Sequence, residues 1–207
     1  MSRSDEADRR RRGRWVIVAL AALFFSGLIA AFVLVQSGWR PSATKNYGEL
    51  VQPPRPLRAV EGLADLAGTA ADTGLFQGKW TFIYFGPAAC GEACRDNLYK
   101  MRQVTLAQGM EAHRVQRVFV LTDSREREGL RALLAEHPGL RVLQGSVAVV
   151  RALAEQFALP AGSPLDGSNR LYLVDPLGNL MMSYPADADP RGINKDLKLL
   201  LRASQVG

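Results

Sequence analysis

A run of 21 residues without a charged side chain, from Trp15 to Val35, constrains this chain more than any other part of its sequence. Only Ser26 and Gly27 interrupt the aliphatic and aromatic residues of the run. At about 1.5 Å per residue, a helix of this length spans roughly 30 Å, the thickness of the hydrocarbon core of a bilayer. A cleaved signal peptide is the alternative, but its apolar stretch covers only about 7 to 15 residues and ends in small residues. The sequence therefore predicts a transmembrane helix over residues 15–35.

The charges around this run predict its orientation. Arg9 to Arg12 and Arg14 stand directly before it, and the positive-inside rule keeps such a segment in the cytoplasm. Residues 1–14 are thus expected to be a basic cytoplasmic tail, with the rest of the chain across the bacterial inner membrane in the periplasm. The net charge is only +6, and half of it belongs to this tail. Because a nucleic-acid-binding domain needs a basic face, we expect no nucleic-acid partner.

After the apolar run, the composition changes to that of a linker. Residues 36–56 contain Pro41, Pro53, Pro54 and Pro56 among polar side chains. Proline lacks a backbone donor and favours extended chain over helix. We therefore expect a proline-rich spacer over residues 36–56 and a folded domain over residues 57–207.

Within the domain, apolar patterns typical of strands and helices alternate. Strands are expected at 81–85, 118–121, 171–174 and 180–184, the last two as a hairpin, and helices at 92–110, 124–136, 147–157 and 193–201. Ser124 is a candidate N-cap. This alternation predicts an α/β fold in which a central mixed sheet is flanked by helices.

The only two cysteines, Cys90 and Cys94, carry the candidate chemistry. They lie where the first expected strand passes into a helix, so Cys90 should lie near free backbone N–H groups, which lower a thiol pKa. Glu92 in the same turn opposes part of that effect. A spacing of four within the first helical turns would put both residues on one face, at a Cα separation that a disulfide tolerates.

Three interpretations of the cysteine pair remain. The thiols could be inert core residues, but a loop rich in glycine and alanine at the end of a strand is a poor place to bury them. A structural disulfide fits an oxidising compartment, although so short a loop would add little stability. The placement favours a functional dithiol with accessible sulfurs, used for exchange or for binding a soft metal.

The residues around the pair resemble the Sco/SenC family of membrane-tethered, thioredoxin-like proteins. The run GKWTFIYFGPAACGEAC resembles the family signature, and the LTD motif at 121–123, HPGLRVLQGS at 137–146 and RLYLVDPLGNL at 170–180 resemble its later blocks in the same order. The resemblance covers about residues 50–202. It implies a thioredoxin-like fold preceded by one transmembrane helix and a role in cytochrome c oxidase assembly. An oxidase subunit or another assembly factor would then be the partner.

The chain departs from the family pattern at three places. Arg95 follows the second cysteine where the family usually has proline, and the segment between Phe157 and Arg170 is shorter than usual. The family's third copper ligand is a histidine five residues before the tyrosine of the YLVDP-like strand, and that position here is Gly167. The cis-proline of thioredoxin-type enzymes also has no counterpart before residue 171, since Pro164 lies too early.

The missing histidine changes what the resemblance implies about copper. Two thiolates suit Cu(I), whereas Cu(II) prefers nitrogen or oxygen donors. His113 and His137 map to helix ends and are interpreted as surface residues, and Asp166 offers a single carboxylate. We therefore expect weak Cu(I) binding by Cys90 and Cys94 at most and no stable Cu(II) site, so copper is the one possible cofactor. The favoured hypothesis is dithiol exchange through Cys90 and Cys94, with a Cu(I) metallochaperone and a non-catalytic assembly scaffold as alternatives.

Overall fold

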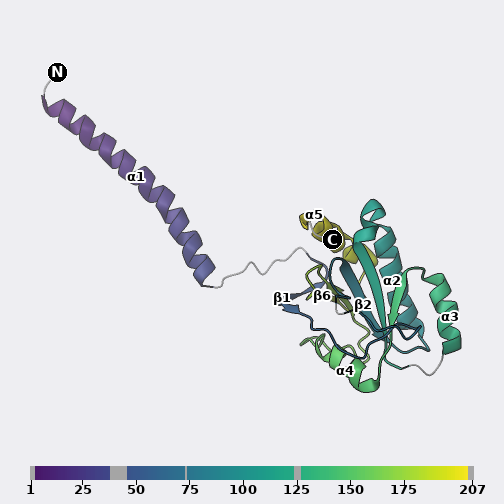
Figure 1. The fold of residues 1–207 in the computed structure, drawn as a ribbon. Coiled ribbons are helices and arrows are strands. Elements are labelled where there is room, and N and C mark those ends of the chain that lie inside the picture. The colour runs from purple at the N-terminus through teal and green to yellow at the C-terminus, as the bar shows by residue number, and fades with distance from the viewer. Residues whose placement is uncertain (1–2, 38–45, 73, 124–126, 205–207) are drawn as a thin grey trace. The chain divides into compact units, whose positions relative to one another are not determined.

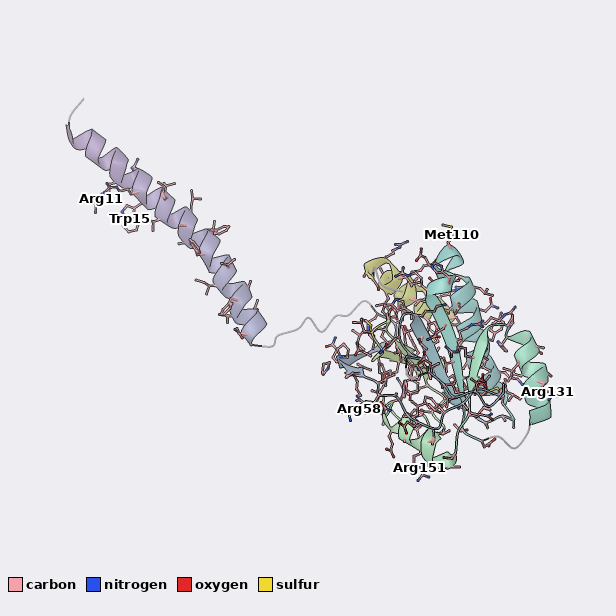
Figure 2. The ribbon with its side chains drawn as sticks, viewed as in Figure 1. Arg11, Trp15, Arg58, Met110, Arg131 and Arg151 are labelled. Atoms are coloured by element: carbon pink, nitrogen blue, oxygen red, sulfur yellow. A yellow bond between two sulfur atoms is a disulfide. The ribbon has the colours of Figure 1, made fainter. Side chains whose placement is uncertain are left out.

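The apolar run forms the C-terminal part of one long helix, α1 (Arg3–Gln36), in the computed structural model (Figure 1). Its segment Arg11–Leu34 is long and apolar enough to cross a membrane. Arg11 and Trp15 lie in the N-terminal half of the helix (Figure 2). The structure describes residues 3–37, 46–72, 74–123 and 127–204, which belong to two units divided after Lys45.

The second unit is built around one six-stranded sheet. Its strands are β1 (Glu49–Pro56), β2 (Trp80–Gly86), β3 (Val115–Leu121), β4 (Leu140–Leu143), β5 (Leu171–Val174) and β6 (Asn179–Tyr184). Their order in the sheet is β1-β6-β5-β2-β3-β4. Strands β2, β3 and β4 run parallel, and β5, β6 and β1 add antiparallel neighbours. The predicted mixed sheet and the β5–β6 hairpin are confirmed.

Helices cover both faces of the sheet (Figure 1). They are α2 (Glu92–Leu106), the 3-10 helix η1 (Gly109–Arg114), α3 (Arg127–Glu136), α4 (Val147–Glu155) and α5 (Pro190–Ala203). Side chains alternate along β2, so Phe82 and Tyr84 pack with α2, α3 and α5, whereas Ile83 and Phe85 pack with α4. Central strand β2 is buried along its whole length because both of its faces are covered.

The expected spacer over residues 36–56 is wrong for its last third. Residues 49–56 form strand β1, which pairs with β6 at the edge of the sheet. The register shifts between Leu50 and Arg55, so Pro53 and Pro54 lie in an irregular part of an edge strand, where a missing N–H is tolerated. The folded unit therefore begins at Asn46 instead of residue 57. Residues 38–45 of the expected spacer lie outside the described residues.

Two helices, α2 and α4, end before their predicted last residues, and α5 extends beyond its predicted bounds of 193–201 at both ends. The helix expected over 92–110 ends at Leu106, and Gly109, with φ +59°, begins the separate helix η1. Helix α4 ends at Glu155, so Phe157 lies beyond it, although its ring is buried in the core as expected. The proposed N-cap Ser124 lies outside the described residues.

Candidate functional site

The cysteine loop begins where β2 leaves the sheet at Gly86. A Cβ atom at Gly86 would lie 2.9 Å from the ring of Tyr84 and 3.1 Å from the ring of Phe119. These two rings stack with centroids 5.9 Å apart and fill the space beneath the loop. A side chain at residue 86 would therefore displace the stacked rings, so glycine allows the backbone to turn here.

Cys90 and Cys94 form a disulfide with their Cα atoms 5.2 Å apart. This separation lies within the range expected from their spacing. Cys94 belongs to the first turn of α2, but Cys90 lies before the helix with φ +22°, so the condition that both lie in the first helical turns is not met. The N–H of Cys90 donates to Pro87 O at 3.1 Å, and Nε of Arg95 donates to Cys90 O at 3.1 Å.

Both cysteines are buried, which corrects the expectation of accessible sulfurs. Each retains 3% of its surface exposed, because Ala88 and the side chains of α2 pack around the bridge in one core cluster. The two residues are nonetheless not equivalent. Cys90 lines a groove on the surface, whereas Cys94 does not. In the oxidised state, Cys90 is thus the residue that a molecule in the groove would meet.

This Cys90 groove has a volume of about 760 Å³ and runs beside α2 toward the end of α3. One stripe of α2 forms its first wall, at positions three or four residues apart: Glu92, Arg95, Asp96, Tyr99 and Arg102. Leu133, Glu136 and His137 line it from α3 and the turn that follows. Cys90 lies at the helix-start end, and Arg102 is the lining residue of α2 farthest along the helix from it.

His137 is buried, with 6% of its surface exposed, so its interpretation as a surface residue is wrong. Its spacing from Leu130 and Leu133 places it on the face of α3 that packs on the sheet, and this periodicity was the available signal. Burial lowers the pKa of His137, and the positive charges of Arg117 and Arg102 lower that pKa further, while Glu136 opposes them. The imidazole is therefore neutral at pH 7. His113 is exposed, as predicted.

The polar atoms beneath this end of the groove are not all paired. Nη2 of Arg117 donates to Pro138 O at 2.5 Å, next to His137 in the chain. Nη1 of Arg117 and Nδ1 of His137 are buried without a hydrogen-bond partner in the described part of the chain. Sequence analysis did not single out Arg117 or Arg102, because neither belongs to a recognisable motif.

The loop before β5, residues 163–170, holds the position of the absent family histidine. Gly167 there is exposed with φ +81°. The Asp166 carboxylate accepts hydrogen bonds from the N–H groups of Ser163 and Ser168, at 2.6 and 2.8 Å. Hydrogen bonding from Ser168 and then from the Ser163 backbone lowers the pKa of Asp166 to about 2. The Asp166 carboxylate therefore stabilises its own loop through these backbone hydrogen bonds.

The same loop is tied to the cysteine segment through Asn169. The hydroxyl of Tyr84 donates to Asn169 Oδ1 at 2.7 Å, and Nδ2 of Asn97 donates to Asn169 O at 2.8 Å. Asn169 has φ +51°, a left-handed conformation that asparagine tolerates better than most residues. Pro164 does not occupy a cis peptide, because the one cis bond among the described residues joins Gln52 and Pro53.

Comparison with known proteins places this site in a family. Residues 80–204 match the family of transmembrane-like, thioredoxin-like C-terminal domains, which is more than half of the chain. The chain belongs to this thioredoxin-like family. The fold predicted from the resemblance is thus confirmed, and β2, the cysteine loop and α2 all lie within the matched residues of this thioredoxin-like chain.

Individual relatives of the thioredoxin-like chain are Sco proteins. The mouse protein named "Protein SCO2 homolog, mitochondrial" is 25% identical over 178 residues, which are 83% of this chain and 69% of the relative. Copper-bound yeast Sco1 is 22% identical with a TM-score of 0.60, covering 72% of this chain and 94% of the other. BsSco, described as having a disulfide switch, is 16% identical with a TM-score of 0.57. The match covers 74% of this chain and 99% of BsSco. The predicted resemblance to the Sco/SenC family is confirmed.

The donor set of this thioredoxin-like chain does not fit a three-ligand copper centre. Its two sulfurs are joined to each other, and the loop that would supply a third ligand has Gly167 at that position. Asp166 is engaged by the backbone of its own loop. Among the described residues there is no group of three histidine, cysteine or acidic side chains placed to hold a metal ion.

Proposed function

We propose that this chain is a membrane-anchored thiol-disulfide exchange protein that acts on a partner in cytochrome c oxidase assembly. The observation that carries the proposal is the disulfide at the strand-to-helix junction, one residue of which lines a groove. The assembly role comes from the relatives, since BsSco is described as a member of a family of cytochrome c oxidase assembly proteins. The apolar segment of α1 supports an anchor, with the basic residues before it in the cytoplasm and the second unit in the bacterial periplasm.

The placement of the sulfurs assigns them different roles in exchange. A partner thiolate entering the groove attacks Sγ of Cys90, the S–S bond breaks, and Cys94 leaves as a thiolate with the electron pair. A second partner thiol then attacks the partner sulfur of the mixed disulfide and releases Cys90. The partner dithiol becomes a disulfide, and two electrons reach the chain. In the reverse direction, the Cys90 thiolate attacks a partner disulfide and Cys94 resolves the intermediate.

The start of α2 supports a thiolate at Cys90. Gly91 is the N-cap of α2 and supplies no side-chain hydrogen bond, so free N–H groups of the first turn remain available. These groups and the helix dipole stabilise negative charge. Glu92, the acidic residue of the first turn, offsets part of that stabilisation. Exchange needs only the two sulfurs, so the absence of a histidine at residue 167 does not prevent it.

Trapping of the intermediate tests the chemistry. The full chain in detergent micelles is prepared as Cys94→Ser and as Cys90→Ser, and each is incubated with a dithiol peptide oxidised to its disulfide. We expect a stable mixed disulfide with Cys94→Ser and much slower capture with Cys90→Ser, because Cys94 does not line the groove. Equal capture by both variants would overturn the assigned roles, and no capture by either would overturn the exchange function.

A genetic measurement tests the assembly role separately. Cells that lack this chain are complemented with the unchanged chain or with Cys90→Ser, and cytochrome c oxidase activity is measured in their membranes. We expect activity to return only with the unchanged chain. Full oxidase activity with Cys90→Ser would refute a need for exchange and favour the non-catalytic assembly scaffold. For the metallochaperone alternative, the reduced full chain is titrated anaerobically with Cu(I), and stoichiometric uptake that depends on both cysteines would favour it over exchange.

A further inference from the structure

Two arginines without an ion pair in the described part of the chain lie with the neutral His137 at the far end of the Cys90 groove. Arg102 and His137 line the groove, and Arg117 lies beneath the same turn, bonded to Pro138 O. None of the three ion pairs among the described residues involves any of these side chains. Burial lowers the pKa of Arg117 and the pKa of His137. The positive charge of Arg102 lowers both pKa values further. The acidic side chain acting on His137 is Glu136.

Two buried nitrogen atoms at this place provide an independent observation. Arg117 is 9% exposed and His137 is 6% exposed, and each has one ring or guanidinium nitrogen without a partner in the part of the chain that the structure describes. A buried polar atom without a partner costs free energy, so such atoms are rare away from sites that bind something. His137 belongs to the lining of the groove, so the unpaired nitrogen is part of a residue that borders it.

The acidic lining residues of α2 lie nearer to Cys90. Glu92 and Asp96 belong to the first turns of α2, and Asp96 is already paired with Lys100 at 2.7 Å. Arg95 lies among these acidic residues and is bonded to Cys90 O, and Glu136 lies beside His137, so the lining carries both signs at each end and Arg102 is its arginine far from the disulfide. The ten helical steps from Glu92 to Arg102 correspond to about 15 Å of helix. An extended peptide covers that distance in about five residues, at roughly 3.3 Å each.

We propose that Arg102 and His137, supported by Arg117, form a carboxylate-binding subsite for an acidic side chain of the redox partner. The partner segment lies extended in the Cys90 groove with its reacting cysteine at Cys90 and an aspartate or glutamate about five residues away. This inference rests on the proposed exchange function and adds a recognition element to it. The guanidinium of Arg102 donates to the carboxylate, and the carboxylate offsets the repulsion between the Arg102 and Arg117 guanidinium groups.

A kinetic experiment tests the subsite. The reduced full chain carrying Cys94→Ser, in detergent micelles, reacts with peptides whose single cysteine is a mixed disulfide with thionitrobenzoate. The Cys90 thiolate attacks the peptide sulfur, a new S–S bond forms, and thionitrobenzoate leaves with the electron pair and is measured by its absorbance. Probes carry glutamate or glutamine five residues before or after the cysteine. We expect the better glutamate probe to react about tenfold faster than its glutamine counterpart, the scale of one charge-assisted hydrogen bond.

Variants of the groove assign that preference to Arg102. Arg102→Gln should reduce the ratio of the two rates to about one, and Arg102→Glu should favour a lysine probe instead. Arg131→Gln is the matched control, because Arg131 is exposed on α3, does not line the groove and projects from the helix surface (Figure 2). The proposal is overturned if the glutamate preference is absent, or if it survives Arg102→Gln unchanged.

A binding measurement separates this proposal from the exchange function. Fluorescent peptides with serine in place of cysteine are titrated with the oxidised full chain, and anisotropy reports their affinity. A glutamate preference that depends on Arg102, together with no reaction at Cys90, would refute exchange and retain the subsite. Reaction at Cys90 with equal rates and equal affinities for both probes would refute the subsite and retain exchange.

Discussion

The hydroxyl of Tyr84 donates a hydrogen bond to Oδ1 of Asn169 at 2.7 Å and so connects strand β2 to the loop before β5. Tyr84 lies in β2, two residues before the glycine at which the chain turns toward Cys90. Asn169 lies directly before Arg170 and β5, in the loop that holds the position of the absent family histidine. Burial raises the pKa of Tyr84, so its hydroxyl stays protonated and remains a donor at neutral pH.

Tyr84→Phe should therefore loosen the loop over residues 163–170. Loss of this hydrogen bond is expected to lower the free energy of unfolding by about 1 kcal/mol, because Oδ1 of Asn169 loses its donor while the ring stack with Phe119 is retained. Urea unfolding measures the stability, and hydrogen exchange of the loop amides measures the local effect. Unchanged exchange in the loop would show that the hydrogen bond does not hold it.

Reduction of the disulfide should leave the domain folded. The bridge joins residues only four apart, so it restricts the unfolded chain little and contributes about 2 kcal/mol at most in the chain-entropy description. Urea unfolding of the full chain with and without a phosphine reductant measures this difference. The Cys90→Ser/Cys94→Ser double variant is the control and should not respond to reductant. Loss of the folded state on reduction would indicate a structural bridge instead of an exchangeable one.

Asp166 should stabilise its loop above the ordinary carboxyl pKa. Its pKa in the folded chain is about 2, below the ordinary value of 3.8, so the carboxylate contributes stability that is present above pH 3.8 and lost as the pH falls toward 2. We expect Asp166→Asn to lower the melting temperature at pH 5 and to match the unchanged chain near pH 2. Asp187→Asn, at an exposed position, is the control, and its difference in melting temperature from the unchanged chain should not disappear near pH 2. A constant difference at all pH values would contradict this assignment.

The sheet could be predicted from the sequence except at its two edge strands, β1 and β4. Strands β2, β3, β5 and β6 consist of apolar runs that only a covered sheet accommodates, so their sequences indicate strands directly. Strand β1 has the sequence ELVQPPRP, which is typical of a linker. It is held by partners far away in the chain, since Asp196 accepts the N–H groups of Tyr47 and Gly48. Such distant contacts have no local signal.

Asp196→Ala should detach the start of this edge strand. The Asp196 carboxylate is buried and also accepts the hydroxyl of Tyr184, so its removal leaves two backbone donors unpaired and the Tyr184 hydroxyl with only Met182 Sδ. We expect a loss of about 2 to 3 kcal/mol in the free energy of unfolding and faster hydrogen exchange in residues 46–56. Asp189→Ala, which removes the N-cap of the same helix, is the control and should leave exchange in β1 unchanged. Equal exchange in both variants would refute the anchoring role.

The candidate site could be predicted only in part. The cysteine pair was recognisable because both its spacing and its place after a buried strand are local properties. Burial of the sulfurs was not, because it depends on how α2 packs beside β2. His137 continues the helical spacing of the buried Leu130 and Leu133, and this spacing indicates burial. Histidine at the end of a helix more often lies at the surface, which is why the sequence favours an exposed side chain. The groove needs α2 and α3 together, which no single segment specifies.

His137 should make stability fall as the solution is acidified. Its pKa in the folded chain lies below the ordinary value of 6.5, because of burial and then of Arg117 and Arg102, with Glu136 opposing. The unfolded chain therefore binds the proton more readily, and stability is fully present above pH 6.5 and declines as the pH falls toward 5. His137→Gln should remove this part of the decline in melting temperature, whereas His113→Gln, at an exposed position, should retain it. If His137→Gln shows the same decline as the unchanged chain, another group is responsible, and the imidazole at the groove is not the neutral, buried one described above.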